Sequence, residues 1–280
     1  MRAAIFGASG LLGKYLVREW TGDEIYPFNS AQVDIRQPQQ VEKIMVRNRP
    51  DWIILTAAYT DVDGCESNPD LAFATNTAGA LNVAEAAKRF GARLLFLSSD
   101  YVFDGLASEP YEVNFPPNPQ SVYGRSKADA ESGILSILPN ACTVRTSWVF
   151  GMRGKCFPDT ILRLAQSRAV LDVVDDQRGA PTYARHLALA IIELCRHKAK
   201  GIVHVTNAGS CSWFEFASEI IRLSALSTTV RPTTTDKFPR PAKRPAYSVL
   251  SLKSLDKYRI HMPSWQEGLT EYIAERNRAV

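Results

Sequence analysis

The sequence predicts a doubly wound α/β fold of Rossmann type, with a smaller C-terminal substrate-binding domain. Three observations support this. Short segments that are apolar throughout alternate with helical segments, as in a parallel sheet covered on both faces. A glycine-rich loop directly follows the first apolar segment, and the alternation becomes irregular after residue 150. We therefore expect a dinucleotide-binding Rossmann domain at 1–150 and a mainly substrate-binding domain at 151–280.

The expected elements of the first domain follow from apolar periodicity. We expect strands at 2–6, 24–28, 51–58, 93–99 and 142–150, and helices at 9–20 and 75–90. A further helix holds Tyr123 and Lys127 and runs to about Leu138. In the second part we expect helices at 158–168, 182–195 and 265–276. A further helix is expected directly after the capping box that Ser212 and Glu215 form. Strands are expected there at 169–175 and 201–207, and we expect the strand at 169–175 to rejoin the sheet of the first domain.

The overall composition is that of a soluble globular protein. Of its 280 residues 45% are hydrophobic and 22% charged, and the net charge of +4 does not indicate nucleic-acid binding. The five cysteines form no CxxC pair, and the four histidines form no metal-binding motif. No apolar run approaches the roughly 18 residues that span a bilayer, and residues 2–6 already read as a strand. We expect a cytoplasmic protein that contacts neither membrane nor nucleic acid.

Glycines at 7, 10 and 13 lie between the first strand and the first helix. They permit a tight turn and bring backbone N–H groups of the helix N-terminus close to a pyrophosphate. This context predicts dinucleotide binding. Asn29 and Ser30 stand where an NAD-binding site usually has an acidic residue, and no arginine obviously binds a 2′-phosphate there. Both NADPH and NADH remain open, with NADPH slightly preferred.

Tyr123 and Lys127 are four residues apart in an expected helix, so both should face one ligand. A neighbouring ammonium lowers the pKa of a phenol, and the phenol can then serve as an acid–base group. Ser99, at the end of an expected strand, can bind the same carbonyl oxygen. Together with the glycine loop, this pattern predicts hydride transfer to a carbonyl, with the proton supplied by Tyr123.

These residues resemble the extended short-chain dehydrogenase/reductases and, within them, the dTDP-4-dehydrorhamnose reductase family. The matching stretches are spread along the chain in the family's order: "GASGLLG", "VDI", "AAYTDVDGCE", "TNTAGALNVAEAA", "SSDYVFDG", "YGRSK", "RTSWVFG", "DQRGAPT" and "RPAYSVL". The resemblance implies an NAD(P)H-dependent oxidoreductase that reduces the C4 keto group of dTDP-4-dehydrorhamnose, a dTDP-linked sugar nucleotide.

The resemblance also implies residue roles. Tyr123 is the proton donor, Lys127 its cofactor-binding partner, and Ser99 the group that orients the substrate. Asp100 and Trp148 contact substrate, and the loop around Arg244 approaches the nucleotide. The residues that match the family's cofactor contacts, beside Gly7 and Gly13 of the loop, are Gly10, Leu11, Leu12, Asp34, Ile35, Ala58, Tyr59 and Thr60.

Some positions depart from the family. Thr56 replaces a frequent asparagine, and Tyr15 and Arg185 stand where some members hold Mg²⁺ with glutamates to form a dimer. A bound Mg²⁺ is therefore doubtful and no metal ligand is assigned, while monomer and homodimer both stay open. The basic loop at 227–245 is either solvated surface or the edge of an anion site.

Other functions on this scaffold also remain open. Related dehydratases follow the strand-end hydroxyl with an Asp-Glu pair, whereas this chain reads Ser99-Asp100-Tyr101, which favours simple reduction. The alternatives are another 4-keto sugar-nucleotide reductase and a non-catalytic regulatory subunit resembling the methionine adenosyltransferase β subunit.

Overall fold

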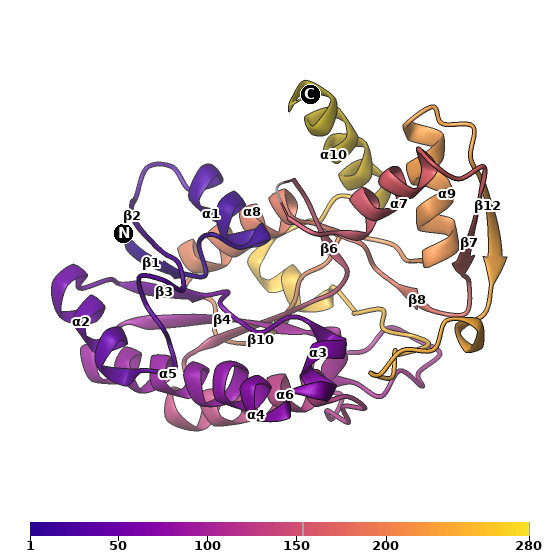
Figure 1. Cartoon of the computed structure of the whole chain (residues 1–280). Helices are drawn as coiled ribbons and strands as arrows, with labels where there is room; N and C mark the ends of the chain where they lie inside the picture. Colours follow the sequence, from indigo (N-terminus) through magenta and orange to yellow (C-terminus); the bar gives the residue numbers. More distant parts are fainter. Residues whose placement is uncertain (153, 280) are drawn as a thin grey trace.

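Over residues 1–152 and 154–279, which the structure describes, the computed structural model is built on one parallel sheet of six strands (Figure 1). The strand order is β2-β1-β3-β4-β5-β10. The bounds are β1 Arg2–Phe6, β2 Glu24–Phe28, β3 Trp52–Leu55, β4 Arg93–Ser99, β5 Cys142–Thr146 and β10 Gly201–His204. The order reverses between β1 and β3, and such a switch point is where doubly wound folds bind ligands. The predicted fold class is confirmed.

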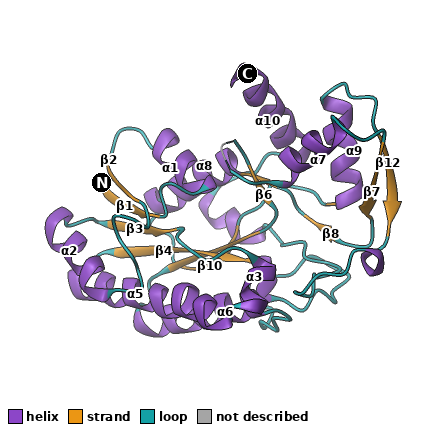
Figure 2. Cartoon of the chain, viewed as in Figure 1, coloured by secondary structure: helices purple, strands orange, loops and turns teal. Residues whose placement is uncertain are grey.

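Helices cover both faces of this sheet (Figure 2). One face carries α2 (Pro38–Asn48), α5 (Gly79–Phe90) and α6 (Val122–Ile137). The other carries α1 (Leu11–Glu19) and α8 (Ala184–Arg196), whose core continues into the C-terminal region. The central strands β1, β3 and β4 are almost entirely buried, as apolar strands between two helical layers should be.

Helix α6 begins just after the proline-rich run that ends at Pro119. The Ser121 hydroxyl accepts a hydrogen bond of 3.1 Å from the Gly124 N–H, which caps the helix. The prolines at 116, 117 and 119 keep the preceding chain extended. This start places the first turn of α6, with Tyr123, beside the carboxyl end of β4.

The strand expected at 169–175 does not rejoin the main sheet. It forms β7 (Val170–Val174), which pairs in parallel with β12 (Thr229–Thr233) in a separate two-stranded sheet. Exposed and buried residues alternate along β7, with Asp172 on the exposed side bound to Arg231. One solvated face suits a peripheral strand and not a strand covered on both sides, so this part of the prediction was wrong.

The sixth strand of the main sheet comes instead from β10, which pairs with β5. Residues 184–204 thus belong to the layers of the Rossmann sheet although they follow residue 150. The remaining C-terminal elements lie beside the carboxyl ends of the strands in Figure 1. They are α7 (Phe157–Ala165), β6 (Val149–Phe150), β8 (Arg178–Gly179), β9 (Thr182–Tyr183), β11 (Cys211–Ser212), α9 (Trp213–Leu223) and α10 (Trp265–Ala279).

Candidate active site

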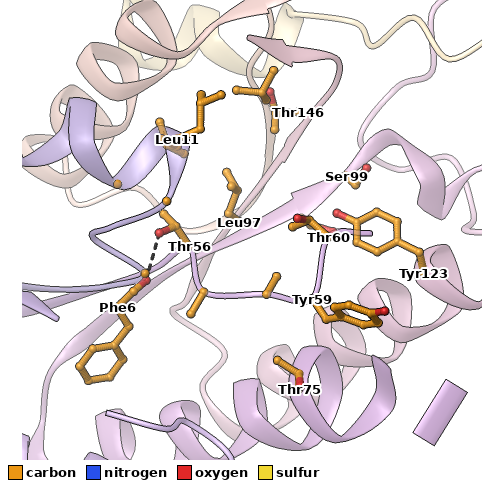
Figure 3. Close-up of a pocket in the computed structure, with 18 of the residues that line it drawn as sticks. Phe6, Leu11, Thr56, Tyr59, Thr60, Thr75, Leu97, Ser99, Tyr123 and Thr146 are labelled. Atoms are coloured by element: carbon orange, nitrogen blue, oxygen red, sulfur yellow. Dashed lines mark hydrogen bonds between the residues drawn. The ribbon is translucent and has the colours of Figure 1, made fainter. Parts of the chain in front are cut away.

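A cleft of about 800 Å³ opens at the switch point between β1 and β3. Its lining comes from the glycine loop, the loops after β2 and β3, the end of β4 and the start of α6. In Figure 3 the labelled side chains of Leu11, Thr60, Ser99 and Tyr123 lie around the cleft; they come from the start of α1, the loop after β3, the end of β4 and the start of α6. The sequence-predicted residues that line it are Gly7, Gly10, Leu11, Leu12, Gly13, Asp34, Ile35, Ala58, Tyr59, Thr60, Ser99, Asp100, Tyr123 and Trp148.

The glycine loop has the geometry of an anion-binding turn. Gly7 has φ +96°, and a Cβ atom on Gly13 would lie 2.2 Å from the Gly7 carbonyl oxygen. The first turn of α1, as described, holds no acidic residue, and Gly10 at its N-cap supplies no side-chain cap. The N–H groups at the start of α1 therefore remain available to a phosphate, which suits the diphosphate of a dinucleotide.

In the loop between β2 and α2, Asp34 and Arg36 line the cleft side by side. The Arg36 guanidinium donates to both Asp34 carboxylate oxygens, with Nη2 at 2.7 Å from Oδ2, and this holds the pKa of Asp34 below its usual range. No sequence pattern pointed to Arg36, because it lies in the loop beyond the end of β2, where periodicity does not place side chains. The site thus offers a cation as well as a carboxylate.

The loop after β3 is held in place by Asn76, a buried residue that sequence analysis missed. Its side-chain oxygen accepts from the Tyr59 N–H at 2.7 Å, and its amide donates to the Tyr59 carbonyl and to the Ser126 hydroxyl. Asn76 lies in a π-helical turn, Phe73–Ala78, before α5. Thr56, where asparagine was expected, donates to the Phe6 carbonyl at 3.0 Å (Figure 3).

Ser99, Asp100 and Tyr123 meet at the floor of the cleft. The Ser99 hydroxyl donates to Asp100 Oδ1 at 2.8 Å, and Figure 3 shows the Tyr123 hydroxyl beside Ser99. Burial raises the pKa of Asp100 to about 6, although the nearby Ser248 and Ser99 hydroxyls oppose this rise. Burial and the Asp100 charge raise the pKa of Tyr123, while the Ser99 hydroxyl lowers it. The phenol is therefore protonated at neutral pH.

Lys127 lies below this floor and does not line the cleft as described. Its side chain is buried, with Nζ 4.2 Å from the centre of the Phe96 ring. Burial lowers the pKa of Lys127 to about 7, against a smaller opposing effect of Glu131. Burial and the Asp100 charge set the Tyr123 pKa, and Lys127 is not among the groups that shift it, so the expected lowering is absent from the described structure.

An aromatic pair forms another wall. Trp148 stacks on Trp213 with ring centres 3.5 Å apart. Trp148 has φ +47° and separates β5 from β6, so the strand expected at 142–150 is divided. Sequence analysis missed Trp213 and the nearby cation Lys155, which both line the cleft. Trp213 is first in α9, far along the chain, and only folding brings it to Trp148.

Arg244 lies outside the cleft lining. Its Nη2 donates to Asp63 Oδ2 at 2.9 Å, and its guanidinium carbon is 5.9 Å from the centre of the Tyr101 ring. Tyr101 in turn contacts the Tyr123 ring edge-on. Arg240 also pairs with Asp63. The basic loop is thereby attached to α3 (Val62–Ser67) at the cleft edge, and Arg244 is connected to the floor through Tyr101.

The comparisons with known proteins agree on one family. The family model described as "RmlD substrate binding domain" matches residues 1–278. The chain belongs to the RmlD, or dTDP-4-dehydrorhamnose reductase, family. The Bacillus subtilis spore coat polysaccharide biosynthesis protein SpsK is 38% identical over 99% of both chains. The dTDP-4-dehydrorhamnose reductase of Mycobacterium tuberculosis is 42% identical over 89% of this chain and 84% of its own.

A solved RmlD-family structure has almost the same fold. The dTDP-4-dehydrorhamnose reductase of Bacillus anthracis, in complex with NADP, has a TM-score of 0.96 and 40% identity, covering 98% of this chain and 99% of its own. The family places this protein among the NAD(P)-dependent oxidoreductases of the extended short-chain dehydrogenase/reductase class that act on dTDP-linked sugars. The family resemblance predicted from the sequence is confirmed.

Tyr15 and Arg185, the two residues that made a bound Mg²⁺ doubtful, have protein partners here. Tyr15 donates to Glu275 at 2.7 Å, and Tyr183 and Arg18 also bind that carboxylate. Arg185 pairs with Glu19 and Glu271. Within residues 1–152 and 154–279, no cluster of three or more His, Cys, Asp or Glu side chains is arranged to hold a metal. In the same residues, no helix has the length and apolar character to cross a membrane.

Proposed function

We propose that this protein reduces the C4 keto group of dTDP-4-dehydrorhamnose to give dTDP-L-rhamnose, with NADPH or NADH as the hydride source. The observation that carries the proposal is the meeting of Tyr123, Ser99 and Asp100 at the floor of a cleft whose other end is the glycine loop. An RmlD-family chain with a protonated phenol there is suited to donate a proton to a substrate oxygen.

The residues around the cleft fit the cofactor. The N–H groups at Gly10 and the first turn of α1 would hold the diphosphate, and the loop of Ala58, Tyr59 and Thr60 would border the ring end. A bound reduced nicotinamide supplies the hydride. Arg36 supports NADPH, because a guanidinium at the adenosine end can bind a 2′-phosphate once it exchanges Asp34 for that partner.

The chain's own groups control the proton. Tyr123 keeps its proton at neutral pH and would release it from Oη to the carbonyl oxygen as the alkoxide forms. Ser99 donates its hydroxyl hydrogen to Asp100 in this structure. A carbonyl oxygen placed between Tyr123 and Ser99 would accept that hydrogen in place of Asp100, so Ser99 would orient the substrate. The Tyr101 N–H, which donates to Ser99 Oγ at 3.3 Å, would continue to hold Ser99.

The wall formed by Trp148, Trp213 and Lys155 suits the sugar nucleotide. Flat aromatic faces can cover a sugar or a base, and the lysine adds positive charge for a diphosphate. The Thr146 hydroxyl, which is buried and without a hydrogen-bond partner among the described residues, also faces this cleft. It is a candidate to bind a sugar hydroxyl.

The test is NADPH and NADH oxidation with dTDP-4-dehydrorhamnose, with the product sugar identified by NMR. Tyr123→Phe should lower kcat by about 10²- to 10⁴-fold while the dissociation constant for NADPH stays nearly constant. Tyr26→Phe removes a surface hydroxyl bonded to Glu24 and serves as the matched control, with unchanged kcat. Full turnover in Tyr123→Phe would refute the assignment.

A second candidate keeps the chemistry and changes the sugar. SpsK, a full-length relative, is named for spore coat polysaccharide and not for a defined substrate. Turnover of another dTDP-4-keto sugar with a kcat/KM higher than that for dTDP-4-dehydrorhamnose would assign this candidate. NADPH binding without oxidation on any 4-keto sugar nucleotide would favour a regulatory role instead.

A further inference from the structure

A buried layer of polar side chains lies between α6 and the sheet, directly beneath the cleft floor. Lys127 and Glu131 come from α6, and Arg145 comes from β5; they are 2%, 3% and 1% exposed. Neither Glu131 nor Arg145 lines the cleft. Charged side chains are rarely buried so deeply unless their partners compensate them, which prompts the question of what this layer does.

Arg145 occupies both oxygens of the Glu131 carboxylate. Its Nε lies 2.9 Å from Oε1 and 3.1 Å from Oε2, and its Nη2 lies 2.6 Å from Oε2. The guanidinium is itself fixed, because Nη1 donates to the Val113 carbonyl and the group lies 4.9 Å from the centre of the Phe103 ring. Planar, bidentate pairing of this kind holds a carboxylate in one orientation.

Lys127 would otherwise be the natural partner of Glu131. The two are four residues apart on one helix, a spacing at which lysine and glutamate side chains pair. Here the Lys127 amine lies over the Phe96 ring instead. Tyr123 is four residues before Lys127 on the same helix, so the amine has the phenol and the cleft on one side and Glu131 on the other.

We propose that Arg145 is a positioning residue for Lys127: by holding Glu131 in a bidentate pair, it leaves the lysine amine uncommitted and able to reach the bound cofactor. The inference rests on the proposed reduction for its biological meaning. The geometry on which it depends is independent of the sugar. Arg145 acts through Glu131 and Lys127 and touches no reacting atom.

Several titratable groups surround this layer. Glu131 and Tyr123 share the helix of Lys127, and Arg145 and His204 come from neighbouring strands. Asp100 lines the cleft, and Cys65 belongs to a small buried cluster against which Tyr123 packs. Burial lowers the pKa of His204 to about 3 and raises the pKa of Cys65 to about 11, so both stay neutral near pH 7. Asp100 has a raised pKa of about 6, so its titration affects the acidic limb of a pH profile and not the alkaline limb.

The charges then predict opposite effects for two variants. In Arg145→Met, the freed Glu131 carboxylate pairs with Lys127, so the lysine pKa rises and the amine is drawn away from the cleft. In Glu131→Gln, the Arg145 charge is left uncompensated, so the lysine pKa falls. Each shift should be about one pH unit, as for a single charge at contact distance. The double variant removes both charges and should return the lysine pKa near its original value.

Two measurements report these shifts. The first is a titration of the Lys127 amine by NMR of protein with ¹³Cε-labelled lysine, assigned with Lys127→Arg. The second is the pH profile of kcat/KM for NADPH. Its alkaline limb should move to higher pH in Arg145→Met and to lower pH in Glu131→Gln. NADPH should bind about tenfold or more weakly to Arg145→Met, as expected on loss of one hydrogen bond to a charged group. Its affinity should recover in the double variant. Arg276→Met, which breaks a remote pair with Asp159, is the control and should change neither measurement.

The outcomes separate the inference from the proposed function. Opposite shifts in the two single variants support the inference even without turnover of a keto sugar, because NMR and NADPH binding need no substrate. Variants that lose thermal stability while the Lys127 titration and the alkaline limb stay in place would overturn it. Should Arg145→Met fail to fold, the Glu131→Gln and double variants carry the same comparison.

Discussion

Replacing Asp100 by asparagine should stabilise the protein, although Asp100 lies in the active-site floor. Asp100 is 2% exposed, and burial raises its pKa from 3.8 to about 6. A carboxyl group whose pKa is raised in the folded state binds protons more tightly there than when unfolded. Folding is therefore relatively favoured below pH 3.8, and stability falls as pH rises through 3.8 to 6.

The magnitude follows from this shift. One pKa unit corresponds to about 1.4 kcal/mol, so the ionised carboxylate destabilises the native state by about 1.5 kcal/mol at pH 5 and about 3 kcal/mol at pH 8. Asparagine carries no charge, and its oxygen can still accept the Ser99 hydrogen bond. Its amide can donate to Ser248, whose buried hydroxyl has no hydrogen-bond partner in the described chain.

The assay is thermal unfolding of Asp100→Asn and the parent protein from pH 5 to 8. At about 2 °C per kcal/mol for a chain of this size, the gain in Tm should rise from about 3 °C to about 6 °C over that range. Asp104→Asn is a control of opposite sign, because the Tyr111 hydroxyl bond lowers the pKa of Asp104. A Tm gain that is absent, or that does not vary with pH, would refute this reasoning.

Three further substitutions test the cleft. Arg36→Leu should weaken NADPH binding at least about tenfold and NADH binding much less, since one charged hydrogen bond to the 2′-phosphate is lost; equal effects in fluorescence titrations would contradict this. Gly13→Ala should abolish dinucleotide binding and lower Tm, because its Cβ would lie 2.2 Å from the Gly7 oxygen; normal binding in calorimetry would count against the turn geometry. Trp213→Ala should raise KM for the sugar nucleotide and leave NADPH affinity unchanged, because Trp148 loses its stacking partner; an unchanged KM would argue that the stacked pair does not hold substrate.

The predictable part of the site depends on local signals. The glycine loop, the end of β4 and the start of α6 each have a sequence pattern that fixes one element boundary. In a parallel sheet those boundaries meet at one edge, so Ser99, Tyr123 and the glycines could be brought together without coordinates. The loop of Ala58, Tyr59 and Thr60 after β3 was assigned to the cofactor only through the family resemblance, and this assignment stays a prediction.

What could not be predicted depends on contacts between distant segments. Asn76 and Trp213 act through partners 17 and 65 residues away, which no periodicity reveals. The helical spacing predicted one shared face for Tyr123 and Lys127, but it gave no information on whether the amine lines the cleft, which it does not. The polar Asp172 within the strand at 169–175 was the available sign that this strand had a solvated face.

The position of β10 limits how the protein can be divided or recombined. This strand completes the nucleotide-binding sheet, yet it is made more than 50 residues after β5, its neighbour. A nascent chain released at residue 150 would leave β5 as a bare edge, prone to pair with other chains. Exchange of substrate specificity between relatives therefore has to transfer loops around a retained 184–204 segment, because a simple cut after residue 150 would separate the sheet from its last strand.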